Sequence, residues 1–226
     1  ARVLVVRDLA AFTERHGSGL PIAREYAGGL NNAGDNIILK DALLDIDIQN
    51  FSYDDESPWP TCADGDGYSL IFMQPETSPD HNDAMNWRCS SLPTGNPGGT
   101  DAVASFVGDA SADDDGDGLS ALVEHFLGTS DQDSSQGNDR YSVGVMTLPS
   151  DGLEYPVMEV RYNVGADGVT PSSLWSQDLQ AWSDLPADIV LESHTMHGDG
   201  TATYVWRSTR STAISPQFFR LKVTKP

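Results

Sequence analysis

An acidic stretch at residues 113–124, DDDGDGLSALVE, constrains the fold of this chain more than any other feature. Within it, five residues stand at fixed positions: Asp113 at position 1, Asp115 at 3, Asp117 at 5, Gly118 at 6 and Glu124 at 12. Alternate residues of a tight loop turn their side chains inward, and Gly118 permits the sharp bend that a side chain would resist. A hard cation of the size of calcium takes six to eight oxygen ligands. The stretch is therefore expected to gather carboxylates around one point.

The spacing is that of an EF-hand calcium loop. In such a loop the residue at position 7 binds through its backbone carbonyl, so the apolar side chain of Leu119 is acceptable there. Glu124 falls on the first turns of a helix predicted over residues 120–127, and Gly128 is a helix stop. The sequence thus predicts a calcium site whose ligands are Asp113, Asp115, Asp117, the Leu119 carbonyl and Glu124. The alternative is an acidic loop that is simply solvated.

The surroundings of this loop differ from those in an EF-hand. Residues 101–112 are too short and too rich in Ala, Ser and Gly for an incoming helix, which leaves one loop and one outgoing helix. The run at 113–129, DDDGDGLSALVEHFLGT, resembles the calcium-binding thrombospondin type 3-like repeats of exported bacterial proteins. The resemblance implies that calcium rigidifies a connector, expected at 101–136. Asp131 and Asp133 follow, and the sequence leaves open whether they complete this site or begin another.

Composition restricts the partners and the compartment. The chain has 13 Lys and Arg against 34 Asp and Glu, a formal net charge of −21, which repels nucleic acid and anionic membranes. No apolar run approaches the roughly 18 residues of a spanning helix, so no membrane insertion is expected. Any signal peptide is expected to have been removed or to lie upstream. Cys62 and Cys89 are predicted to form a disulfide, and hence to indicate export, unless they are two buried thiols.

Residues 1–100 have the pattern of β-structure. Strands are predicted at 3–6, 36–41, 45–53 and 68–72, and one helix at 9–17 with Asp8 as its cap. Asp54 and Asp55, with Asp64 and Asp66, flank the turn at 58–60. They form either a second, weaker calcium site or two acidic turns.

A series of motifs across this segment resembles a bacterial lamin-tail domain: DLAAF (8–12), AGGLNNAGD (27–35), ILKDA (38–42), FSYDD (51–55), PWP (58–60), ADGDGYSL (63–70), NWR (86–88) and GNPG (95–98). The resemblance implies an immunoglobulin-like β-sandwich. The opening strands usual in that family are missing, so the chain is expected either to be a fragment or to take those strands from another polypeptide. Subunits completing one another head to tail would form a filament.

Residues 137–226 return to a β-pattern, with strands predicted at 157–162, 201–206 and 217–223. The runs LWSQDLQAW (174–182) and FFRLKV (218–223) resemble a small β-module at the ends of exported multidomain bacterial proteins, and a second small β-sandwich is expected. Trp175, Trp182 and Trp206 are interpreted as core residues, with sugar stacking as the alternative.

Motifs for catalysis are weak. The five histidines lack metal-ligand spacing, His194 and His197 fall in an expected hairpin loop, and neither a nucleophile elbow nor a phosphate loop is present. The sequence therefore predicts a non-enzymatic, calcium-stabilised extracellular protein region. Its role would be structural or adhesive, in a surface or filament assembly with other extracellular proteins or copies of itself. The alternatives are an accessory C-terminal region of a larger exported hydrolase and a carbohydrate-binding module.

Overall fold

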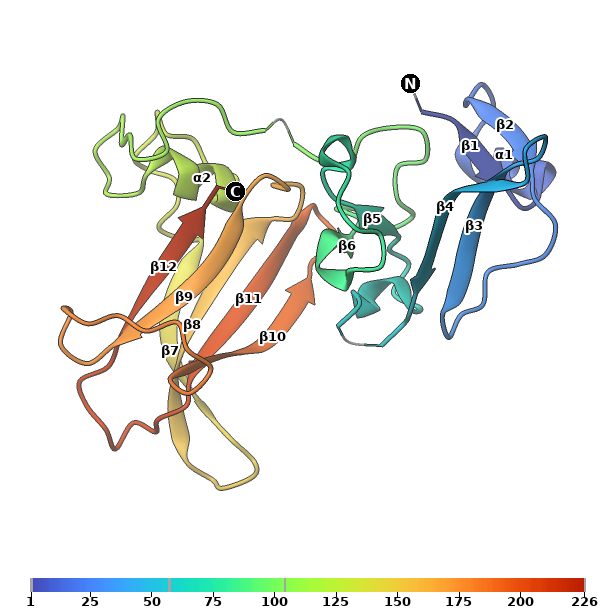
Figure 1. Cartoon of the computed structure of the whole chain (residues 1–226). Helices are drawn as coiled ribbons and strands as arrows, with labels where there is room; N and C mark the ends of the chain where they lie inside the picture. The colour runs from blue at the N-terminus through green and yellow to red at the C-terminus, as the bar shows by residue number, and fades with distance from the viewer. Residues whose placement is uncertain (1, 57, 104, 226) are drawn as a thin grey trace. The chain divides into compact units, whose positions relative to one another are not determined.

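The computed structural model describes residues 2–56, 58–103 and 105–225 (Figure 1). The chain divides into two compact units, Ala1–Asp101 and Ala102–Pro226. Both units are built mainly of strands, so the predicted mainly-β class is confirmed. None of the helices in the described parts of the chain has the length and apolarity needed to cross a bilayer.

The first unit contains one α-helix and three two-stranded sheets among its described residues. Strands β1 (Leu4–Val6) and β2 (Ile22–Glu25) pair in parallel, and the other two pairs are antiparallel: β3 (Asp35–Asp41) with β4 (Ile46–Tyr53), and β5 (Leu70–Phe72) with β6 (Trp87–Cys89). Helix α1 (Leu9–His16) begins where Asp8 Oδ1 accepts a hydrogen bond from Ala11 N at 2.9 Å, as predicted for the cap. It ends at Gly17, whose φ of 84° suits a residue without Cβ.

The interior of this unit is small. Its buried apolar residues are Val6, Cys62, Ala84 and Cys89, while Ile46 and Ile48 of β4 stay more than half exposed. An aromatic group joins β4 to the last hairpin: the Trp87 ring lies 5.5 Å from that of Phe51 and 4.9 Å from that of Phe72. The predicted disulfide between Cys62 and Cys89 is present, with Cα atoms 6.1 Å apart. It ties the short 3-10 turn Thr61–Ala63 to β6.

An ion pair closes the end of the first unit. Arg88 donates to Asp101, and both side chains are largely buried, at 12% and 7% exposure. Asp101 also accepts hydrogen bonds from Ser91 N at 2.8 Å and Ser91 Oγ at 2.9 Å. Burial by itself raises the pKa of Asp101, but the bonds from Arg88 and Ser91 outweigh it and the net pKa is lowered.

Because of this ion pair, we expect the first unit to lose stability in acid. A carboxyl group whose folded pKa is lowered contributes stability that is present above its unfolded pKa, near 3.8, and is lost as pH falls through the folded value. Asp101→Asn keeps the acceptor oxygen but removes the charge, and should reduce the free energy of unfolding at pH 7 by about 1–2 kcal/mol. Urea unfolding at pH 7 and pH 3 measures both effects. The difference in the free energy of unfolding between variant and wild type should shrink at pH 3. An equal difference at both pH values would contradict the assignment. The control is Asp66→Asn, a substitution of an exposed aspartate.

Among its described residues, the second unit contains two antiparallel sheets and one α-helix. The larger sheet has the order β10-β11-β8-β7 and the smaller pairs β12 with β9. The strands are β7 (Tyr141–Thr147), β8 (Glu154–Asn163), β9 (Thr170–Ser176), β10 (Ile189–Met196), β11 (Thr201–Ser208) and β12 (Phe218–Thr224). Three of them overlap the predicted strands, and the Asp199-Gly200 turn precedes β11. Trp175 and Trp206 are buried core residues, as interpreted from the sequence, so neither ring is exposed for stacking on a sugar. Trp182 is half-buried, with Arg220 over its ring.

Helix α2 (Ala121–Leu127) belongs to the core of this second unit. Its Leu122, Phe126 and Leu127 are at most 5% exposed and join β8 and the two sheets in one apolar cluster. The Phe126 ring stacks on that of Tyr162 of β8 at 4.9 Å. The acidic loop at 113–120 is therefore attached directly to the core of the unit whose sheets follow it (Figure 1).

Candidate metal centre

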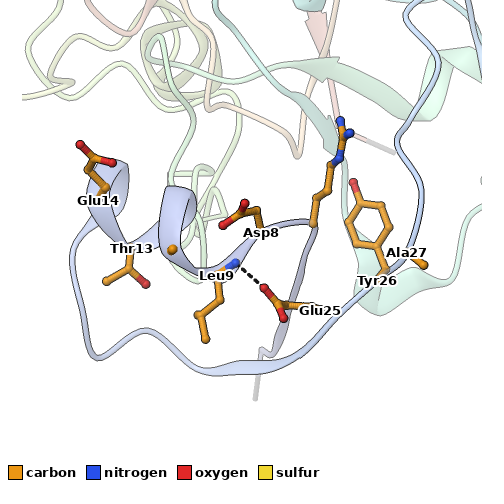
Figure 2. A pocket seen from close by; sticks show the side chains of 9 residues that line it. Asp8, Leu9, Thr13, Glu14, Glu25, Tyr26 and Ala27 are labelled. Carbon is orange, nitrogen blue, oxygen red and sulfur yellow. Dashed lines mark hydrogen bonds between the residues drawn. The ribbon is translucent and has the colours of Figure 1, made fainter.

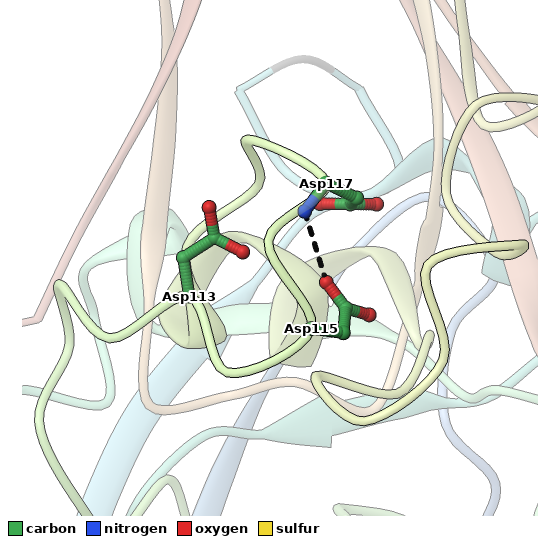
Figure 3. A group of neighbouring side chains, drawn as sticks. All are labelled: Asp113, Asp115 and Asp117. Atoms are coloured by element: carbon green, nitrogen blue, oxygen red, sulfur yellow. Dashed lines mark hydrogen bonds between the residues drawn. The ribbon is translucent and has the colours of Figure 1, made fainter.

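The three aspartates at positions 1, 3 and 5 of the acidic loop converge. One carboxylate oxygen from each of Asp113, Asp115 and Asp117 lies within 4.8 Å of the other two (Figure 3). Figure 3 shows all three side chains on one tight turn of the backbone. This group could hold a metal ion, and it is the one such group among the residues that the structure describes.

The loop holds its shape through bonds from backbone amides to these same carboxylates. Asp113 accepts from Gly116 N at 2.8 Å and from Gly118 N at 3.1 Å, and Asp115 Oδ1 accepts from Asp117 N at 3.1 Å. Gly118 has a φ of 93°, the left-handed conformation that the predicted bend requires. The backbone thus occupies one oxygen of Asp115 and leaves the other directed inward.

Two inward oxygens of this loop lack protein partners. Asp115 Oδ2 and Asp117 Oδ2 are buried and make no hydrogen bond among the described residues. Asp117 uses its other oxygen to accept from Leu119 N at 2.7 Å. Burying a carboxylate oxygen without a partner costs several kcal/mol unless a cation or donor compensates it.

Glu124, predicted to close the site, is the most deeply buried of the acidic residues in this region. Its side chain on α2 is 1% exposed, and Oε2 is buried without a hydrogen bond. Oε1 accepts a hydrogen bond of 3.3 Å from Thr129 Oγ1. Burial first, and then the negative charges of Asp115, Asp117 and Asp131, raise the pKa of Glu124, while the Thr129 bond opposes the shift. Glu124 is not a member of the group whose oxygens lie within 4.8 Å of one another, so the structure brings together Asp113, Asp115 and Asp117 but not Glu124 with them.

The oxygen atoms available in this region suit a hard divalent cation as ligands. Three buried oxygens from Asp115, Asp117 and Glu124 have no protein donor, and the nearby Asp113 completes a set of carboxylates only. Calcium and magnesium prefer oxygen ligands of this kind. Leu119 is half-buried and packs its side chain on the core, so its role as a ligand rests on its backbone carbonyl, as the spacing predicts.

Two contributors to this region were not predicted from the sequence. Thr129 donates to Glu124 at the end of α2, and buried Gly137 lies against the loop: a Cβ there would clash with Leu119 Cδ1 and lie 3.9 Å from Asp117 Oδ2. The Gly-Thr pair after the helix was a visible signal for Thr129. Gly137 carried no local signal, because the contact depends on how the chain returns after residue 130.

The other acidic residues separate into different roles. Asp131 is close enough to raise the pKa of Glu124, whereas Asp133 accepts from Ser135 and Gln136 within its own turn. Asp54 accepts from Glu56 N at 3.1 Å, and Asp64 from Asn32 Nδ2 at 3.0 Å. In the described residues no three ligand atoms from Asp54, Asp55, Asp64 and Asp66 converge as those of the acidic loop do.

A broad, open depression beside α1 contains several acidic groups (Figure 2). The residues that line it are Arg7, Asp8, Leu9, Ala10, Thr13, Glu14, Glu25, Tyr26 and Ala27. Asp8 caps α1, and Glu25 Oε1 accepts a hydrogen bond of 2.6 Å from Leu9 N, which Figure 2 marks by a dashed line. Both carboxylates therefore serve the N-terminus of the helix.

The hairpin loop expected at His194 is wrong. His194 lies in β10, and its Nε2 is 3.0 Å from the Tyr162 hydroxyl. Its ring packs 4.7 Å from that of Tyr204, its partner across the β10–β11 pair. The strand continues to Met196 because the turn that reverses the chain comes later, at Asp199-Gly200.

No family model matches the chain, and neither the curated proteins nor the solved structures contain a significant match. The resemblances to lamin-tail domains and to thrombospondin type 3-like repeats therefore remain predictions. What the acidic loop does must be argued from its own geometry.

Proposed function

We propose that residues 113–124 bind one calcium ion through Asp113, Asp115, Asp117, the Leu119 carbonyl and Glu124, and that the ion fastens the acidic loop to α2 in the core of the second unit. One observation carries the proposal: the buried, unpartnered Oε2 of Glu124, on a helix that is otherwise packed in an apolar core. A cation compensates this oxygen and those of Asp115 and Asp117 together.

The energetic consequence is coupling between the ion and the fold. Without a cation, several carboxylates share a small volume and Glu124 is desolvated among them, which opposes folding. A bound divalent ion turns this repulsion into attraction and adds stability by mass action, because the unfolded chain lacks the converged site. The ion then acts as a structural clamp for α2.

In this proposal the protein is a non-enzymatic structural or adhesive region of an extracellular assembly. A disulfide in the first unit is compatible with an oxidising compartment, and extracellular calcium suffices for a site of low affinity. The immunoglobulin-like arrangement of the first unit and a small sandwich in the second belong to the same proposal. They are supported by the strand content and by the sequence resemblances.

Calcium titration calorimetry tests the site directly. We expect one calcium per chain with a dissociation constant on the order of 10⁻⁴–10⁻³ M, weaker binding of magnesium, and no measurable heat for Glu124→Ala. Magnesium demands a tighter octahedral set of oxygens than a loop of this kind supplies. Glu159→Gln, an exposed substitution on β8, is the control. Equal heats from wild type and Glu124→Ala would refute the assignment.

A further inference from the structure

A second site of different chemistry lies in the first unit, in a cleft of about 360 Å³. The residues that line it are Leu30, Asn31, Asn32, Ile37, Phe51, Tyr53, Asp54, Asp55, Pro60, Ala63, Asp64, Leu70 and Trp87. They come from β3, β4, β5 and β6, from the loop before β3 and from the segment between β4 and β5. Its volume is in the range of small-ligand pockets.

The lining of this cleft is apolar and aromatic. The rings of Phe51 and Trp87 stack 5.5 Å apart, and Ile37 and Leu70 add aliphatic surface. The indole of Trp87 is fixed by a hydrogen bond of 2.9 Å from Nε1 to the carbonyl of His81. The cleft therefore offers a partly open apolar surface, with the Trp87 ring held in place, to an apolar group.

The polar part of the lining carries a single sign of charge. Asp54, Asp55 and Asp64 contribute carboxylates, and none of the described lining residues is Lys, Arg or His. The backbone hydrogen bond from Glu56 lowers the pKa of Asp54. The cleft thus combines an apolar lining with uncompensated negative charge.

This combination selects against a bare metal ion. Calcium needs several oxygens close to one point, and the carboxylates here do not supply three that converge within 4.8 Å. One of them, Asp64, is already held by Asn32. A larger cation that spreads its charge and carries carbon atoms satisfies both parts of the lining, through contact with aromatic rings and attraction to the carboxylates.

We propose that this cleft binds an organic ammonium cation, with its alkyl part against Phe51 and Trp87 and its charge toward Asp54 and Asp55. The ligand is either a free organic ammonium ion or the side chain of a lysine, which share this chemistry. The site is separate from the calcium loop, because all its residues belong to the first unit.

The test is a titration of the full chain, ¹⁵N-labelled and kept in calcium, with three probes followed by amide and indole NMR shifts. Choline represents a free quaternary ammonium ion, and Nα-acetyl-lysine methylamide represents a lysine side chain of a protein. The third probe, 3,3-dimethylbutan-1-ol, is the uncharged isostere of choline. We expect at least one of the two cations to shift the signals of Asn32 and the Trp87 indole, with a dissociation constant on the order of 1 mM. The neutral alcohol should bind at least tenfold more weakly.

A charge-matched pair of variants completes the design. Asp54→Asn/Asp55→Asn should weaken binding of the cation by roughly tenfold, since each carboxylate contributes a partly exposed ion pair. Glu56→Gln/Asp66→Asn removes the same charge from exposed positions outside the lining and should leave the affinity within about twofold. Tighter binding of the lysine probe identifies a protein side chain as the natural ligand, and tighter binding of choline a free amine.

Three results would overturn the inference: no shifts from either cation at 50-fold the expected dissociation constant, equal affinity for the neutral alcohol, or equal weakening by the two double variants. A fourth result would replace the proposed ammonium site with a metal site. If calcium alone shifts the Asn32 and Trp87 signals in a calcium-free sample, the cleft is a metal site.

Discussion

Replacing Glu124 by Gln is expected to stabilise the calcium-free protein and to abolish its stabilisation by calcium. In the wild type, the buried Oε2 of Glu124 has no donor among the described residues, and burial, followed by the charges of Asp115 and Asp117, raises the pKa of Glu124. The amide of Gln removes the buried charge and with it the repulsion from these aspartates. We expect the free energy of unfolding of the calcium-free variant to rise by about 1–2 kcal/mol.

Calcium should stabilise the wild type more than the Glu124→Gln variant. At a free calcium concentration about 100 times the dissociation constant, the wild type should gain about 2.7 kcal/mol, whereas Glu124→Gln should gain almost nothing. Urea unfolding with and without calcium, together with hydrogen exchange of the α2 amides, measures both quantities. Glu159→Gln should behave as the wild type. A variant that is less stable than the wild type without calcium, or equally stabilised by it, would exclude this role for Glu124.

The pH dependence of the calcium-free protein follows from the same burial. Burial, followed by the repulsion from Asp115 and Asp117, raises the folded pKa of Glu124 above its ordinary value of 4.5. A group whose folded pKa is raised contributes stability that is fully present below the unfolded pKa and is lost as pH rises through the folded one. The advantage of Glu124→Gln should therefore vanish below about pH 4 and develop as the pH rises toward 7.

Removing the disulfide is expected to unfold the first unit while the second stays folded. The bridge joins residues 27 positions apart, and in the chain-entropy model a loop of this length contributes about 3–4 kcal/mol. The buried apolar residues of the first unit are few and two of them are the cysteines themselves, so little packing replaces the bridge. The second unit has its own continuous core around α2 and β8.

The measurement is a two-dimensional amide spectrum of Cys62→Ala/Cys89→Ala at 37 °C, beside the wild type. Signals from the first unit should collapse toward unfolded positions, and signals from β8 and β11 should stay dispersed. The second unit is thus an internal control for expression and handling. If the variant kept both sets of signals and melted at the same temperature as the wild type, the aromatic group around Trp87 would be sufficient to hold the first unit folded without the bridge.

Local features of the sequence predicted much of this structure. The Asp8 cap of α1, the glycine stop of α2, the disulfide and the convergence of Asp113, Asp115 and Asp117 are all present. These features depend on contacts within a few residues or on a single pair of cysteines. Strands β2, β6, β7, β9 and β10 were not predicted. Each becomes a strand by pairing with another one, β9 with the distant β12, and β7 and β10 with the next strand along the chain.

The sequence by itself determined the acidic loop, since alternating carboxylates around Gly118 bind their own backbone amides and need no distant residue. Only the tertiary structure decided what that loop is attached to. Glu124 is buried because Leu122, Phe126 and Leu127 draw α2 into the core of the second unit, and Gly137 closes against the loop from farther along the chain. Burial depends on the packing of both sheets, and it is burial that leaves these carboxylate oxygens without a donor among the described residues, the observation on which the proposed cation site rests.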